Sequence, residues 1–171
     1  MSLCLPEQTV RLSLNSFLPN NEAGGTVKMT ELLFKGKEFV YNHHLAVPHR
    51  PLVPDAGKSV GTPDLAGNLI IQGDNLHALK ALLPFYAGKV DCILIDPPYN
   101  TGAAFEHYDD GLEHSIWLSL MRHRMLLLKS LLHKEGVIFV QIDDKEMAYL
   151  RILMDEVFER KNFLNMMVNI Q

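Results

Sequence analysis

Four consecutive residues, Asp96, Pro97, Pro98 and Tyr99, follow directly after the apolar run at residues 90–95. The run has the length and β-branched content of a buried strand, and a proline cannot donate to a sheet ladder, so both prolines must lie beyond the strand's carboxyl end. The residue before a proline avoids helical geometry, and two prolines fix φ twice, which makes the loop stiff. Because ligands of open α/β sheets bind at the carboxyl ends of strands, this pattern predicts a preorganised reaction centre.

The chemistry that these residues suit is alkylation at nitrogen. The Asp96 carboxylate and the Pro97 carbonyl are two acceptors beside an aromatic ring. An exocyclic amino group on a nucleobase is a poor nucleophile, because its lone pair is delocalised into the ring. Two acceptors that hydrogen-bond to the amino group would favour a pyramidal nitrogen with its lone pair freed. Tyr99 offers a surface for an extruded base, and such stacking is worth about 1 to 3 kcal/mol. A rigid turn with a surface tyrosine is the alternative interpretation.

These residues resemble the Asp/Asn/Ser-Pro-Pro-Tyr/Phe motif of DNA amino-methyltransferases, which methylate adenine N6 or cytosine N4 from S-adenosylmethionine. The Asp form is similar to the adenine type, the beta class. Further blocks are similar to the modification subunits of type III restriction systems and related site-specific adenine methyltransferases, and the resemblance runs through roughly residues 35 to 171. The matching blocks are residues 68–79, 86–89, 95–102, 105–110, 112–118, 142–146 and 153–158.

The resemblance implies a site-specific methyltransferase that transfers methyl from S-adenosylmethionine to a flipped adenine in double-stranded DNA. Asp96, Pro97, Pro98 and Tyr99 would form its catalytic loop. The segment matching Asp74 and Asn75 borders the S-adenosylmethionine pocket in the family. Asp74 could equally be a plain helix cap, so both interpretations of the Gly-Asp-Asn turn stay open.

The elements around the motif alternate between strand and helix. This order predicts a parallel, doubly wound sheet, here an incomplete one of the Rossmann-like methyltransferase type. Residues 1–67, rich in Pro, Gly and Asn, are predicted to be an irregular extension and connector, and residues 68–171 a partial catalytic domain. The predicted elements are strands at 69–71, 90–95 and 137–142, a starting strand at 163–170, and helices at 76–83, about 115–132 and from the N-cap Asp144 onward.

Composition restricts the partners and the location. The net charge of −4 counts against DNA binding by this fragment alone, since DNA-binding proteins usually present a basic face. The basic cluster Arg122-His123-Arg124 falls in the second half of a predicted helix, where cations complement the macrodipole. The absence of an 18-residue apolar stretch and of a signal peptide predicts a cytoplasmic protein without membrane insertion. Two cysteines and scattered histidines predict no metal site.

The chain lacks the Phe-x-Gly-x-Gly cofactor motif, which the family places downstream of its recognition region. We therefore expect an amino-terminal piece of a longer enzyme, whose partners would be the missing carboxyl-terminal half or a restriction subunit, with a possible homodimer at full length. Two alternatives remain. The chain could be a non-catalytic remnant or partner-binding module, and the enzyme could instead be specific for cytosine N4, because the two acceptors would serve either base.

Overall fold

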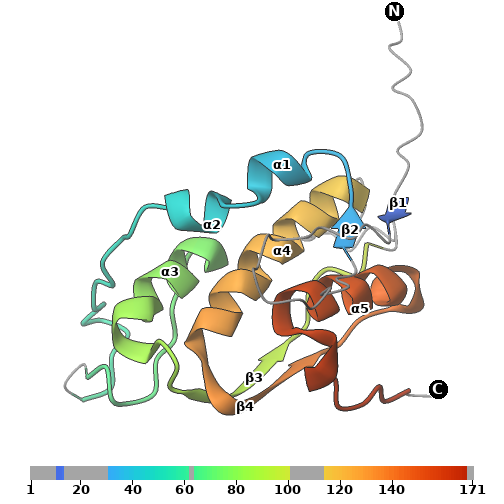
Figure 1. The fold of residues 1–171 in the computed structure, drawn as a ribbon. Helices are drawn as coiled ribbons and strands as arrows, with labels where there is room; N and C mark the ends of the chain where they lie inside the picture. The colour runs from blue at the N-terminus through green and yellow to red at the C-terminus, as the bar shows by residue number, and fades with distance from the viewer. Residues whose placement is uncertain (1–10, 14–30, 62–63, 101–113, 169–171) are drawn as a thin grey trace, which may run out of the picture. The chain divides into compact units, whose positions relative to one another are not determined.

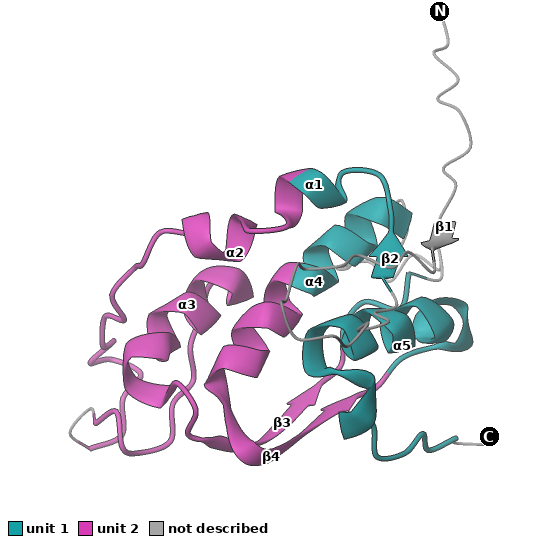
Figure 2. Ribbon diagram, viewed as in Figure 1, with its two compact units in different colours: residues 1–38, 97–122, 142–171 teal, residues 39–96, 123–141 magenta. Residues whose placement is uncertain are grey.

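The computed structural model describes residues 11–13, 31–61, 64–100 and 114–168 (Figure 1). The chain forms two compact units (Figure 2). Unit 1 comprises residues 1–38, 97–122 and 142–171, and unit 2 comprises residues 39–96 and 123–141. The chain passes from one unit to the other after residues 38, 96, 122 and 141. Neither unit is therefore one continuous stretch of sequence.

Unit 2 contains a two-stranded parallel sheet of β3, Val90–Ile95, and β4, Leu132–Val140. The register pairs Cys92 with Val137 and Ile95 with Val140, after an irregularity between Val90 and Cys92. Parallel strands need a crossover connection, which is usually helical. Here the connection contains α4, His114–Leu131, as the apolar periodicity of this segment predicts. The coarse prediction of an α/β fold with parallel pairing is thus confirmed.

Helix α3, Asn75–Tyr86, also lies in unit 2 and begins at the N-cap Asp74. It continues two residues past Pro84, where the sequence predicted its end. A proline so near the end of a helix disrupts few intrahelical bonds, and the helix closes with the Ala87 amide donating to the Leu83 carbonyl. Gly88, with φ +66, then provides the left-handed residue that commonly follows a helix. The short helix α2, His43–Ala46, accepts a hydrogen bond from Lys80 of α3 at the carbonyl of His44.

Unit 1 is built around α5, Asp144–Phe158, which buries Leu150, Leu153 and Val157 along one face. This spacing of three and four residues gives the apolar stripe of a helix packed on one side. Strand β2, Glu31–Leu33, packs against α5 and pairs antiparallel with β1, Arg11–Ser13. The remaining short helices are α1, Lys37–Val40, which extends across the boundary into unit 2, and η1, Arg160–Asn162.

The start of α5 corrects one sequence prediction. Asp143, rather than Asp144, is the N-cap, and its carboxylate accepts a hydrogen bond from the amide of Lys145. Asp144 is instead the first helical residue. Both positions suit an acidic side chain near the positive end of a helix, so the sequence alone does not show which of the two adjacent aspartates is the N-cap.

The sheet is smaller than the sequence predicted. Residues 69–71 and 163–168 adopt no strand, so the parallel sheet of the described residues consists of β3 and β4. Extended apolar segments become strands only when a neighbour completes the ladder, and Ile70 and Leu164 are largely exposed. The prediction of strands at these two segments is therefore wrong for the structure described. None of the described helices is long and apolar enough to span a membrane.

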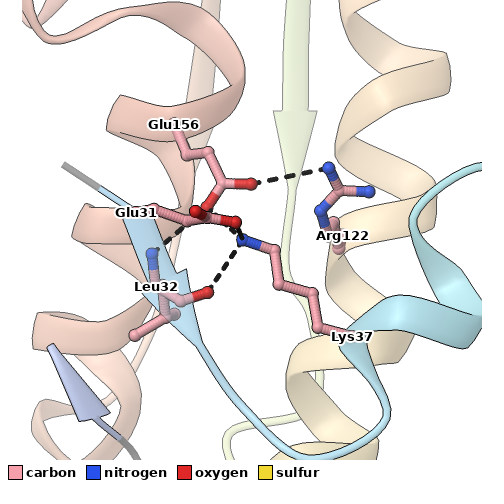
Figure 3. A network of polar contacts seen from close by, with 5 residues as sticks. All are labelled: Glu31, Leu32, Lys37, Arg122 and Glu156. Carbon is pink, nitrogen blue, oxygen red and sulfur yellow. Dashed lines mark hydrogen bonds and ion pairs between the residues drawn. The ribbon is translucent and has the colours of Figure 1, made fainter. Parts of the chain in front are cut away.

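A partly buried polar network joins three segments of unit 1 (Figure 3). The Lys37 ammonium donates to Glu31 Oε1 at 2.8 Å, to the Leu32 carbonyl at 2.9 Å and to Glu156 Oε2 at 2.9 Å. Glu156 also accepts from the Leu32 amide at 3.3 Å and pairs with Arg122 at 3.4 Å. Residues 31–37 lie in the range predicted as an irregular extension, yet they contribute a buried leucine and a buried lysine to this unit.

Candidate active site

Asp96 follows the last residue of β3 and is exposed to solvent. The ladder ends with the Gln141 amide donating to the Ile95 carbonyl at 3.0 Å, one residue before Asp96. The prolines come after this final bond, in agreement with the sequence argument that they lie beyond the strand. Asp96 is the last residue of its segment in unit 2, and Pro97 is the first of its segment in unit 1.

The loop after Asp96 is anchored at Pro98. The indole Nε1 of Trp117 donates to the Pro98 carbonyl at 2.7 Å, and Trp117 is fully buried in the first half of α4. Pro97, Pro98 and Tyr99 are half-buried. The Pro98 carbonyl therefore accepts a hydrogen bond that holds the loop. The carbonyl predicted to accept from an amino group of the substrate is a different one, that of Pro97.

A second anchor follows at Asn100. Its backbone has φ 58, a left-handed conformation that asparagine tolerates better than most residues. Its side-chain Nδ2 donates to Glu146 Oε1 at 2.7 Å. His114 Nδ1 lies 3.0 Å from the same oxygen, and the His114 ring contacts the edge of Tyr149 with centroids 4.3 Å apart. Two contacts thus flank Tyr99, one residue away on either side.

Trp117, Asn100 and Glu146 were not predicted as residues of the site. Trp117 was predicted only as part of an apolar helix face. A buried indole N–H usually needs an acceptor, so a lone tryptophan on a core face is a signal that a nearby carbonyl must be available. No comparable local signal connects Asn100 with Glu146, which are 46 residues apart.

The two residues predicted to border the cofactor lie in unit 2. Asp74 Oδ1 accepts from the amides of Leu76 at 2.9 Å and His77 at 3.3 Å, the geometry of an N-cap. Asn75 Oδ1 accepts from Arg124 Nε at 2.7 Å. Burial lowers the pKa of the Arg124 guanidinium, while the negative charge of Asp74 opposes that shift. The helix-cap interpretation of Asp74 is therefore observed.

The same turn also fits one edge of an S-adenosylmethionine site. Asp74 is exposed, and its cap bonds use Oδ1. Gly73 has φ +150, and a side chain placed there would meet no atom within 4 Å, so the backbone is open to a ligand. A carboxylate at this position suits the hydroxyl or amino groups of a nucleoside. Within residues 31–61, 64–100 and 114–168, no cluster of His, Cys, Asp and Glu has the arrangement of a metal site.

Comparison with known proteins shows what the segment around this site resembles. Residues 90–170 match a family model described as DNA methylase. The chain is 56% identical over 107 residues to the probable type III restriction-modification enzyme HindVI Mod subunit of Haemophilus influenzae, a match that covers 63% of the chain and 14% of that protein. It is 39% identical over 127 residues to the EcoPI Mod subunit of Escherichia phage P1, covering 57% and 20% respectively.

A further relative is the type II methyltransferase M.KpnI of Klebsiella pneumoniae, 35% identical over 123 residues, which are 67% of this chain and 29% of that enzyme. The chain spans a fifth or less of the length of the type III Mod subunits named above. The segment that matches the DNA methylase model, residues 90–170, includes the Asp-Pro-Pro-Tyr loop and both of its anchoring residues, Trp117 and Glu146. Residues 90–170 therefore match the DNA methylase model, and the chain is similar to the modification subunits of type III restriction-modification systems.

Proposed function

We propose that this chain supplies the catalytic loop of an adenine-specific DNA methyltransferase of a restriction-modification system. The observation that carries the proposal is the exposed Asp96 at the end of β3, followed by a loop held at Pro98 by Trp117 and at Asn100 by Glu146. A loop fixed on both sides of Tyr99 suits a reaction that depends on positioning. The match to the DNA methylase model and the similarity to a type II methyltransferase support methyl transfer to DNA.

The roles of the residues follow from their chemistry. The Asp96 carboxylate and the Pro97 carbonyl each accept a hydrogen bond from the adenine N6 amino group, and this favours a pyramidal nitrogen with an available lone pair. Tyr99 stacks on the purine once the base has been flipped from the duplex. Pro97 and Pro98 restrict the backbone so that the acceptors keep their orientation before the base arrives.

The implied methyl donor is S-adenosylmethionine, and we assign one edge of its site to Asp74 and Asn75. When bound, this cofactor supplies a methyl group made electrophilic by the adjacent sulfonium. The exposed Asp74 carboxylate would accept a hydrogen bond from the nucleoside part, and Asn75 is held in place by Arg124. The rest of the pocket would come from the longer chain that the relatives possess, because this chain has no glycine-rich cofactor motif.

The complete domain would be a doubly wound parallel sheet, with residues 68–171 as its first part. Leu94 on β3 is 74% exposed and Phe139 on β4 is 40% exposed, which suits a sheet face covered in the complete enzyme. The partners proposed are double-stranded DNA with a flipped adenine, a restriction subunit, the remaining carboxyl-terminal part and, at full length, a second copy. Action on cellular DNA would place the enzyme in the cytoplasm.

A hybrid enzyme tests the proposal. The 107-residue segment of the Haemophilus influenzae Mod subunit that matches this chain is replaced by the corresponding residues of the chain. Transfer of tritiated methyl from S-adenosylmethionine to DNA is then measured for the hybrid, for Asp96→Ala and for Asp91→Ala. Asp91 lies on the same strand with a side chain that is 88% exposed, so it is a matched control.

We expect the hybrid and its Asp91→Ala variant to methylate DNA, and the Asp96→Ala variant to lose activity by at least about 100-fold, as expected when a group that acts on the reacting atom is removed. An inactive hybrid beside an active Haemophilus parent would contradict the proposal, as would full activity after Asp96→Ala. Cytosine methylation would support the N4 alternative instead.

A further inference from the structure

Glu146 is a buried carboxylate outside the Asp-Pro-Pro-Tyr motif. It lies in the first turn of α5 and is 4% exposed. Its Oε1 accepts from Asn100 Nδ2 at 2.7 Å and lies 3.0 Å from His114 Nδ1. Both short contacts therefore converge on one oxygen of the carboxylate.

The other side of this carboxylate is incompletely satisfied. Within the described part of the chain, Glu146 Oε2 has no hydrogen-bond partner although it is buried, and the same holds for His114 Nε2. Burying a carboxylate is costly unless its oxygens are fully bonded, and buried unsatisfied groups are rare in native proteins. Stability alone therefore gives little reason for a glutamate at this position, since an apolar side chain would avoid that cost. A function that needs the carboxylate is the better explanation.

The contact partner indicates what that function is. Asn100 directly follows Tyr99, and its left-handed backbone, φ 58, is a conformation that most side chains disfavour. The hydrogen bond that Asn100 donates to Glu146 holds this conformation on one side of Tyr99. The bond from Trp117 to the Pro98 carbonyl holds the backbone on the other side. The peptide that carries the tyrosine is thus fixed between two contacts from α4 and α5.

We propose that Glu146 is a positioning residue of the methyl-transfer reaction. It acts through Asn100 to fix the backbone at Tyr99 and thereby the orientation of the ring on which the flipped base stacks. The proposal rests on the function proposed above and adds a residue that lies 50 positions beyond Asp96 in the sequence. The competing interpretation is structural, because an acidic residue in the first turn of a helix also stabilises that helix.

The first test uses the 171-residue chain and does not depend on catalysis. The side-chain amide signals of Asn100 are identified in the ¹⁵N NMR spectrum by their loss in Asn100→Gly, a substitution that the left-handed backbone accepts. We expect these signals and those of the Tyr99 backbone to shift in Glu146→Ala. Glu146→Gln retains an acceptor oxygen and is expected to preserve the Tyr99 signals. The matched control is Asp144→Asn, an exposed acidic residue in the first turn of the same helix, which should leave both sets unchanged.

The second test measures methylation by the hybrid enzyme. Glu146→Ala is expected to lower kcat roughly 10- to 100-fold, as for a small misplacement of a reacting group, with the KM for DNA and the folded fraction unchanged. Glu146→Gln should restore most of kcat. Combining Asn100→Gly with Glu146→Ala should cost no more than the larger single effect, because both changes remove one interaction.

The results separate the two interpretations. Unshifted Tyr99 signals in Glu146→Ala, or a kcat loss matched by an equal loss of folded protein, would overturn the positioning role. An unaltered hybrid without activity would count against the proposed function, while the NMR experiment would still decide whether Glu146 fixes the loop.

Discussion

Replacing Glu156 with glutamine removes the carboxylate that Lys37 and Arg122 share in the partly buried network. Glu156 is 10% exposed and lies 2.9 Å from the Lys37 ammonium and 3.4 Å from Arg122. At an effective dielectric constant of about 20, each pair at roughly 3 Å is worth about 5 kcal/mol before desolvation is subtracted. Removing one partner of a buried pair costs about 3 to 5 kcal/mol. Since Lys37 keeps its ion pair with Glu31 at 2.8 Å, we expect the free energy of unfolding to fall by the lower of these values, about 3 kcal/mol.

Urea denaturation of the chain measures this loss, with the emission of its single tryptophan, Trp117, as the signal. Trp117 is fully buried in unit 1, so its emission reports on the unit that contains the network. With a slope of about 2 kcal/mol per M, the midpoint should fall by roughly 1.5 M. Glu159→Gln is the matched control, because its ion pair with Lys161 is exposed and should contribute little. A midpoint for Glu156→Gln equal to that of the control would show that the shared carboxylate does not stabilise unit 1.

Three other substitutions test the anchors and the helix starts. Trp117→Phe leaves the Pro98 carbonyl without its donor, so we expect the free energy of unfolding to fall by about 1 to 3 kcal/mol, as measured by thermal melts monitored by circular dichroism. Backbone amides of the loop should also exchange hydrogen faster. Unchanged exchange would contradict the anchoring role of Trp117. Asp74→Ala should lower the free energy of unfolding by about 1 kcal/mol in the same melt, and Asp74→Ser by much less, because serine also caps a helix. The proposed contact of Asp74 with the cofactor predicts that both variants weaken S-adenosylmethionine binding by the hybrid enzyme in calorimetry. Asp143→Ala should likewise cost about 1 kcal/mol and Asp144→Ala little, and the reverse order in denaturant midpoints would show that the cap is misassigned.

The parts of the fold that the sequence predicted well are those with strong local patterns. The apolar run ending at two prolines located β3, since a proline cannot donate to a sheet ladder. The prediction that this strand is buried was wrong, because Cys92 and Leu94 are exposed. The three-and-four spacing of leucines located α4 and α5 to within a residue or two. The cap of α3 was likewise correct, because the Gly-Asp-Asn turn offers a side chain suited to that role.

The parts that the sequence did not predict depend on partners distant in the chain. Residues 69–71 have a strand-like composition but remain outside the sheet, because no ladder partner lies beside them in the described structure. The contacts that fix the loop join Asn100 to Glu146 across 46 positions and Pro98 to Trp117 across 19. The loop's stiffness was predicted from its prolines, whereas the side chains that hold it became evident only from the packing of α4 and α5.

Asp96 and its loop are proposed to act on the exocyclic amino group of adenine. Nucleoside mass spectrometry of DNA methylated by the hybrid enzyme identifies the methylated base, with Asp96→Ala prepared in parallel. We expect N6-methyladenine from the unaltered hybrid and none from the variant. N4-methylcytosine as the product, or N6-methyladenine at equal yield from Asp96→Ala, would contradict it.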